Sequence, residues 1–193
     1  MAWLAVRRRR PCLQHGPQPR SGADNVPPFM YVLMLHGVLG FLDIIVNHEL
    51  LEKLPGRGDA AREEGIHAVR ETIFACLFAS LAWFEWHGVL VWWIGGLLLC
   101  EVFVSAHDVI VEGDTRVLPV SERVLHLLLF VNLGITITLV AHALLWWQAG
   151  PAAPVRVDYG WASWVLTGMS VLSAIWAVRD GTAAMRRRDV AAV

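Results

Sequence analysis

Five stretches of the chain are apolar over about 20 residues each, and this length constrains the fold more than any other feature of the sequence. An α-helix rises 1.5 Å per residue, so about 20 residues cross the hydrocarbon core of a bilayer, which is roughly 30 Å thick. The stretch at 159–178 has no charged residue and no histidine, which makes it the clearest of the predicted spans. The other four are residues 29–47, 66–86, 89–111 and 124–147.

Composition also favours a membrane protein with one domain. Apolar residues make up 56% of the 193 residues, and the mean hydropathy is +0.50. Because the connecting segments are short, we expect a single membrane domain at 29–179, a disordered tail at 1–28 and a basic cytoplasmic tail at 180–193. Met30 opens the first span and is a candidate for the true start of the chain, so we assign no function to the first tail. The formal net charge of −1 gives no basic field, and we expect no nucleic-acid partner.

The distribution of lysine and arginine predicts which ends of the spans face the cytoplasm. Basic residues are present in segments 50–65 and 112–123 and in the C-terminal tail. The opposite ends are joined by a turn at 87–88 with no Lys or Arg and by a loop at 148–158 with a single Arg. By the positive-inside rule, the basic segments face the cytoplasm. We therefore expect a multi-pass plasma-membrane protein with its N-terminus outside and its C-terminus in the cytoplasm.

Tryptophan supports the same alternation of spans. Indole rings concentrate at the headgroup level of a bilayer, because one edge is apolar and the other can donate a hydrogen bond. Most of the ten tryptophans fall near the ends assigned to the outer face, namely Trp83, Trp86, Trp92, Trp93, Trp146, Trp147, Trp161 and Trp164. This belt supports five spans of alternating direction.

The opposite ends of the first four spans carry a dense set of histidines and carboxylates. Ionisable groups at membrane depth are costly, so their convergence on one level is by default a functional-site hypothesis. Imidazole and carboxylate together form a ligand set that iron, manganese and zinc accept. The set comprises Asp43, His48, Glu49, His67, Glu71, His107, Asp108, Glu112, Glu122 and His126.

Helical spacing predicts which of these side chains share a face. His67 and Glu71 are four residues apart on the second span, and the same spacing joins Asp108 to Glu112 and Glu122 to His126. A structural role is the alternative for each residue; Glu122, for example, lies in a first helical turn, where the helix dipole favours a carboxylate. We expect the metal ligands to be His67, Glu71, His107, Asp108, Glu112 and His126, with Asp43, His48 and Glu122 as further ligands or as partners of ligands.

Ferritin-like bundles offer an architectural comparison. They hold two metal ions between carboxylates on two helices and a Glu-x-x-His pair on each of two others. Here His-x-x-x-Glu and Glu-x-x-x-His replace Glu-x-x-His, so the analogy concerns architecture and not family membership. The three His boxes of membrane desaturases and hydroxylases are missing from the sequence. The predicted fold is an all-α integral membrane protein with five transmembrane helices, in which the first four form a bundle around a polar His/carboxylate site.

Two further histidines lie toward the outer face. His36 is about two turns inside the first span, and His142 is about one turn inside the end of the fourth. Histidines on facing helices can serve as the axial ligands of a b-type haem, so this pair is a candidate haem site. The alternative is that each imidazole bonds to the backbone or to the other imidazole.

These patterns favour a membrane oxidoreductase with a di-metal centre. We expect two iron ions, and a lipid-like or quinone-like substrate that reaches them at the cytoplasmic membrane face. A zinc-dependent hydrolase is the nearest alternative, because the ligand types do not separate zinc from iron. A proton or divalent-ion transporter and an electron-transfer subunit with haem b are the others. Against transport, the fifth span has no polar path, and no helix is broken by paired Gly or Pro. Catalytic residues and protein partners are not identified by the sequence.

Overall fold

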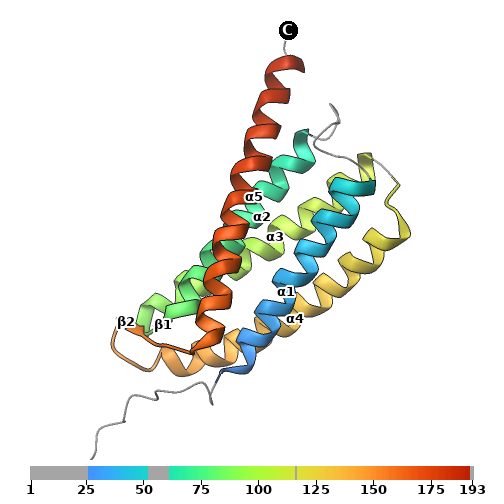
Figure 1. Cartoon of the computed structure of the whole chain (residues 1–193). Helices are drawn as coiled ribbons and strands as arrows, with labels where there is room; N and C mark the ends of the chain where they lie inside the picture. Colours follow the sequence, from blue (N-terminus) through green and yellow to red (C-terminus); the bar gives the residue numbers. More distant parts are fainter. Residues whose placement is uncertain (1–25, 52–60, 116, 192–193) are drawn as a thin grey trace, which may run out of the picture.

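A computed structural model describes residues 26–51, 61–115 and 117–191, and it is helical apart from one short ribbon (Figure 1). The prediction of five apolar helices long enough to cross a membrane is confirmed. In chain order these helices are α1 (Pro28–Asp43), which continues as the π-helix η1 (Ile44–Leu51), α2 (Ala61–Trp83), α3 (Val91–Thr115), α4 (Val120–Trp147) and α5 (Trp161–Ala191). Successive helices alternate in direction, so the ends of α1 and α3 lie beside the starts of α2 and α4 (Figure 1).

The ribbon closes the opposite end of the molecule and was not predicted. Strand β1 (Phe84–Trp86) pairs antiparallel with β2 (Pro154–Arg156), and the 3₁₀ turn η4 (Gly88–Leu90) then leads into α3. Gly88 has a φ of +59°, and a Cβ at this position would lie 2.7 Å from the backbone of Ala152. The turn between α2 and α3 therefore requires glycine.

The apolar core lies in the half of the bundle nearest the ribbon. Helix α5 packs mainly along α2, whereas α1 packs against α4 and α2 against α3. Large apolar side chains also cover the outside of the helices, with Trp92 74% and Phe103 67% exposed, as expected of surfaces that face lipid. The largest fully buried apolar side chains are Met30, Leu33, Leu77, Phe78, Leu81, Ile94 and Leu166.

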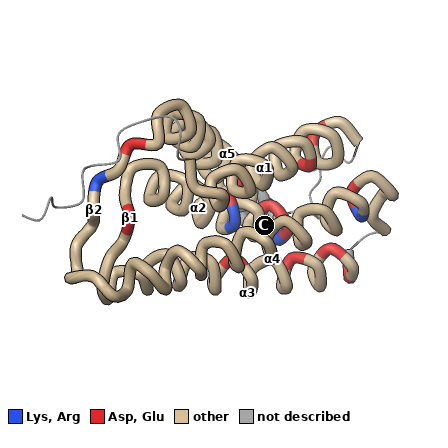
Figure 2. Tube along the Cα trace, turned by 90° about the horizontal axis from the view of Figure 1, so that it is seen from below, with Lys and Arg blue, Asp and Glu red and all other residues tan. Residues whose placement is uncertain are grey.

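Most of the described charged residues lie away from the ribbon, although Figure 2 also shows charged residues on β1 and β2. Several tryptophans lie near the ribbon, where Trp83 donates to Thr167 Oγ1 at 2.8 Å and Trp93 donates to Ser80 Oγ at 2.9 Å. The buried His/carboxylate cluster among the helices, predicted from the sequence, is also present.

All five helices extend beyond the predicted spans, and the largest changes concern α2 and α5. Helix α5 continues past residue 178 to Ala191, and α2 begins at Ala61 instead of residue 66. The first turn of α2 contains Glu63 and Glu64, whose carboxylates interact favourably with the N-terminal end of the helix dipole. Both side chains are buried, so the earlier start of α2 brings two additional carboxylates into the interior.

Candidate metal centre

The π-helical segment at the end of α1 positions two side chains of the site. Asp43 and His48 are five residues apart, which would place them about 140° apart around a regular α-helix. In a π-helix the repeating hydrogen bond spans five residues, so side chains at this spacing lie nearly above one another. Both side chains are buried, and His48 Nε2 lies 3.9 Å from Asp43 Oδ2. The irregular turn therefore aims the imidazole at the bundle interior.

Helices α2 and α4 begin with the same ligand pattern. In each helix the third residue is glutamate and the seventh is histidine, giving Glu63 and His67 on α2 and Glu122 and His126 on α4. Residues four apart share a helix face, so each helix presents one carboxylate and one imidazole to the interior. The two antiparallel hairpins, α1–α2 and α3–α4, thus make similar contributions to the cluster.

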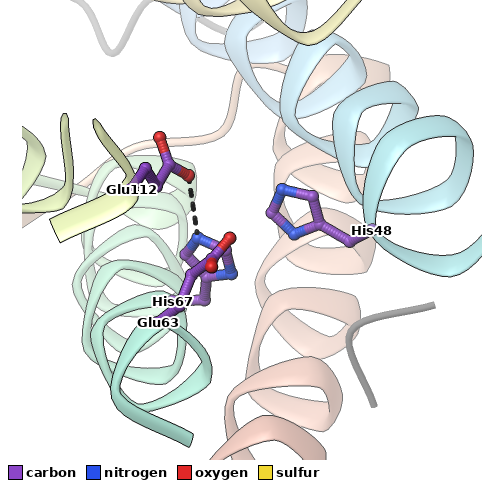
Figure 3. Close-up of side chains that lie close together, drawn as sticks. All are labelled: His48, Glu63, His67 and Glu112. Carbon is purple, nitrogen blue, oxygen red and sulfur yellow. Dashed lines mark ion pairs between the residues drawn. The ribbon is translucent and has the colours of Figure 1, made fainter. Parts of the chain in front are cut away.

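Four buried side chains from three helices form the first group that could hold a metal ion (Figure 3). These are His48, Glu63, His67 and Glu112, each offering a ligand atom within 4.8 Å of the others. The His48 and His67 rings stack with their centroids 4.4 Å apart, and His67 Nε2 lies 3.7 Å from Glu112 Oε1. Imidazoles from α1 and α2 therefore meet a carboxylate from α3.

A second group overlaps the first and adds the ligands of α4. It consists of His48, Glu112, Glu122 and His126, again with one atom of each within 4.8 Å of the others. His126 Nδ1 lies 3.4 Å from Glu112 Oε2, and His48 Nε2 lies 3.4 Å from Glu122 Oε1. Glu112 therefore turns one carboxylate oxygen toward His67 and the other toward His126, so it could contribute one oxygen to each group.

The separations within the cluster suit atoms that share a metal ion. A direct hydrogen bond from an imidazole to a carboxylate has a donor–acceptor distance of about 2.7–3.2 Å. Two ligand atoms bound to one ion at about 2.0–2.2 Å lie about 3 to 3.6 Å apart. The 3.4 Å contacts of Glu112 and Glu122 fall in the second range. Carboxylates buried to this degree are normally paired with cations or coordinate metals, and Glu63, Glu112 and Glu122 are at most 3% exposed.

Two aspartates stand beside the imidazoles. His126 Nε2 lies 3.2 Å from Asp43 Oδ2, and His67 Nε2 lies 3.6 Å from Asp108 Oδ1. Asn47 Nδ2 in turn donates to Asp43 Oδ1 at 2.6 Å. A carboxylate on one ring nitrogen fixes the orientation and tautomer of a histidine that ligates through its other nitrogen. His126 has this arrangement, because its Nδ1 faces Glu112 and its Nε2 faces Asp43. Asp108, in contrast, faces the same His67 Nε2 that lies near Glu112.

Arg70 links the site to the middle of the bundle. Its Nε donates to Glu101 Oε1 at 3.2 Å, and its Nη1 donates to Asp108 Oδ2 at 2.8 Å. Ser105 also donates to Glu101, at 2.7 Å. This network ties α2 to α3 immediately behind His67.

Most of the sequence-predicted residues converge. His48, His67, Glu112, Glu122 and His126 belong to the two groups, and Asp43 and Asp108 adjoin them. Glu71 lies outside both groups; it is buried and lines a neighbouring cavity. His107 is exposed, and its Nε2 lies 3.4 Å from Arg62, because it is turned about 100° around α3 from the inward-facing Asp108. Glu63 was not predicted, although its spacing to His67 matches that of Glu122 to His126.

The two outer histidines are not brought together. His36 is buried, stacks on Phe74 at 4.4 Å and lies with its Nδ1 3.2 Å from Asn132 Nδ2. His142 is ten residues further along α4 from Asn132, about 15 Å of helix, and is exposed. The pair therefore does not have the geometry of the two axial ligands of one haem.

A cavity of about 110 Å³ adjoins the cluster between α1, α2 and α5. His48 and His67 line it together with apolar side chains such as Phe74, Phe78 and Met169, and its charged lining residues include Asp43, Arg70 and Glu71. The cluster therefore borders a partly apolar space among the helices.

No family model, curated protein or solved structure gives a significant match to this chain. The site offers three imidazoles and three carboxylates from four helices. These ligand types determine which metal ions it could hold. This mixture of nitrogen and oxygen ligands suits iron, manganese or zinc better than the hard cations Mg²⁺ and Ca²⁺.

Proposed function

We propose that this protein is a membrane oxidoreductase with a di-metal centre, using two iron ions, that acts on an apolar molecule dissolved in the bilayer. The observation that carries the proposal is the pair of overlapping four-residue groups that share His48 and Glu112. A single ion would need only one such group. The opposed directions of the two Glu112 oxygens, toward His67 and toward His126, support a second ion on the other side of the carboxylate.

The metal pair and the cavity beside it support oxidation of a molecule from the bilayer. Each iron, when bound, can change its charge by one electron, so a pair suits two-electron chemistry. The cavity beside His48 and His67 has apolar walls at Phe74, Phe78 and Met169, although Asp43, Arg70 and Glu71 also line it. The chain itself holds the ions, orients the His126 imidazole through Asp43, and admits an apolar molecule from the bilayer side, such as a lipid or a quinone.

Transport is less well supported by the packing. The half of the bundle near the ribbon is filled by buried apolar side chains such as Met30, Leu77 and Leu81. An ion or proton path across the membrane needs polar groups or water along its whole length. In the described part of the chain, this apolar core separates the charged end from the ribbon end.

Metal analysis of the purified protein tests the proposed function. We expect about two equivalents of iron per chain and an absorption spectrum without a Soret band, because the ligands are imidazole and carboxylate without a haem pair. Stoichiometric zinc would contradict the redox assignment and favour a hydrolase. A Soret band would favour a haem protein, and a protein purified without metal would favour transport or a structural network.

We further propose that the charged end of the bundle faces the cytoplasm of a plasma-membrane protein. The described basic residues Arg62, Arg123 and Arg186 lie at this end. A reporter fused after Val193 should therefore be cytoplasmic, and an epitope inserted between Gln148 and Ala149 should be accessible from outside intact cells. Accessibility of both tags from the same side would contradict the five-span alternation.

A further inference from the structure

The cavity beside the metal centre is lined by two residues outside the metal groups whose buried polar atoms have no hydrogen-bond partner among the described residues. Both carboxylate oxygens of Glu71 and the indole Nε1 of Trp176 are buried and make no hydrogen bond within the described part of the chain. Glu71 is 8% exposed, and both residues line the cavity. Burying a polar group without a hydrogen bond is costly, so a donor and an acceptor left open in one cavity indicate a ligand that satisfies them.

The cavity reaches the lipid-facing surface between α1 and α5. These two helices make few contacts with each other, because α1 packs against α4 and α5 packs against α2. Phe41 of α1 and Leu172 of α5 both line the cavity, yet they are 40% and 38% exposed. An apolar chain can therefore lie between the two helices, with one end in the bilayer and the other near His48.

Glycine residues shape this opening on α1. A Cβ at Gly37 would lie 3.0 Å from Met169 Sδ, so α1 and α5 approach closely there. One turn further along, a Cβ at Gly40 would meet no atom within 4 Å, although Gly40 also lines the cavity. The space beside Gly40 is therefore open. The cavity of about 110 Å³ is also several times larger than the roughly 10–15 Å³ that one buried water needs.

We propose that this cavity binds a single-chain lipid alcohol, with its hydroxyl group between Glu71 and Trp176 and its chain leaving between α1 and α5. A hydroxyl group is both donor and acceptor, so it can donate to the Glu71 carboxylate and accept from Trp176 Nε1. A fatty acid would place a second carboxylate beside Glu71, which a low-dielectric site disfavours because Arg70, the cation in the lining, already pairs with Glu101 and Asp108. A hydrocarbon would leave both polar groups unsatisfied. That the bound alcohol is the substrate rests on the proposed function, since the same cavity is lined by His48 and His67.

Binding of radiolabelled hexadecanol to the full chain in nanodiscs tests this inference, with palmitate and hexadecane as competitors. We expect hexadecanol to be retained in preference to both. Gly40→Leu should weaken retention at least about tenfold, because the new side chain fills open space without a backbone clash. Gly134→Leu is the matched control, since Gly134 is an exposed helical glycine on α4 that also has no atom within 4 Å of its Cβ position.

Substitution of Glu71 tests the hydroxyl site separately from the shape of the cavity. Glu71→Leu should reduce the preference for hexadecanol over hexadecane, while Gly134→Leu keeps it. Unfolding temperatures first establish that both glycine variants are folded. Equal retention of hexadecanol by Gly40→Leu and Gly134→Leu would then overturn the proposal. A preference of the unmodified chain for palmitate would overturn it as well. Metal content is measured on the same samples. Alcohol binding without metal would refute the metal-dependent function alone, whereas bound metal without alcohol binding would refute the cavity assignment alone.

Discussion

Replacing Glu112 with alanine is expected to remove nearly all of the bound metal, from about two equivalents per chain to close to none. Glu112 belongs to both four-residue groups, and its two oxygens face the imidazoles of His67 and His126. Removing it leaves each ion with fewer protein ligands and removes the negative charge that separates the two cations. His67→Ala and His126→Ala each affect only one group, so each should lose about one equivalent.

This series separates one-metal from two-metal sites when metal is measured by elemental analysis of the purified variants. His107→Ala is the matched control, because His107 is the α3 histidine nearest the site in sequence but is exposed on the helix surface. It should keep both equivalents. If His67→Ala lost all metal and His126→Ala lost none, the site would hold a single ion in the first group. Full occupancy of Glu112→Ala would exclude the bridging role.

The positions of the five spans, and the end of the bundle that carries the site, could be predicted from the sequence because both depend on local features. Run length identifies a membrane helix, and the alternation of spans then places the ends of the first four helices together. Helical spacing placed Asp108 and Glu112 on one face of α3, and the structure has both side chains buried. The same argument excludes His107, whose position one residue earlier turns it outward. His107 was grouped with the inward-facing residues although its angular position around the helix turns it outward.

Two features of the site could not be obtained from run length. The second span was predicted to begin at residue 66, because Arg62, Glu63 and Glu64 interrupt the apolar pattern; in the structure these residues form the first turns of α2. The repeated Glu-x-x-x-His spacing was the signal that could have identified Glu63. The π-helical turn that orients His48 has no signature in the apolar pattern, because an apolar run does not distinguish a π-helical turn from an α-helical one.

Replacing Arg70 with leucine is expected to cost about 3 kcal/mol or more of stability. The guanidinium donates to Glu101 and Asp108, which are 0% and 1% exposed. Removing the cation leaves two carboxylates buried without their counter-charge, which is far more costly than losing a surface ion pair. For a chain of this size the apparent Tm in detergent should fall by roughly 6–12 °C. Circular dichroism of the purified protein measures the change.

Two further variants show whether the loss arises from charge burial. Arg62→Leu makes the same substitution two turns earlier on α2, where the side chain is exposed, and should change stability by less than about 1 kcal/mol. Adding Glu101→Gln to Arg70→Leu removes one of the two stranded charges and should recover part of the lost stability, since the amide is neutral and Ser105 can still donate to it. If the double variant were less stable than Arg70→Leu alone, the network would act through packing. Arg70 would then be a spacer between α2 and α3, and the position of Asp108 beside His67 would not depend on its charge.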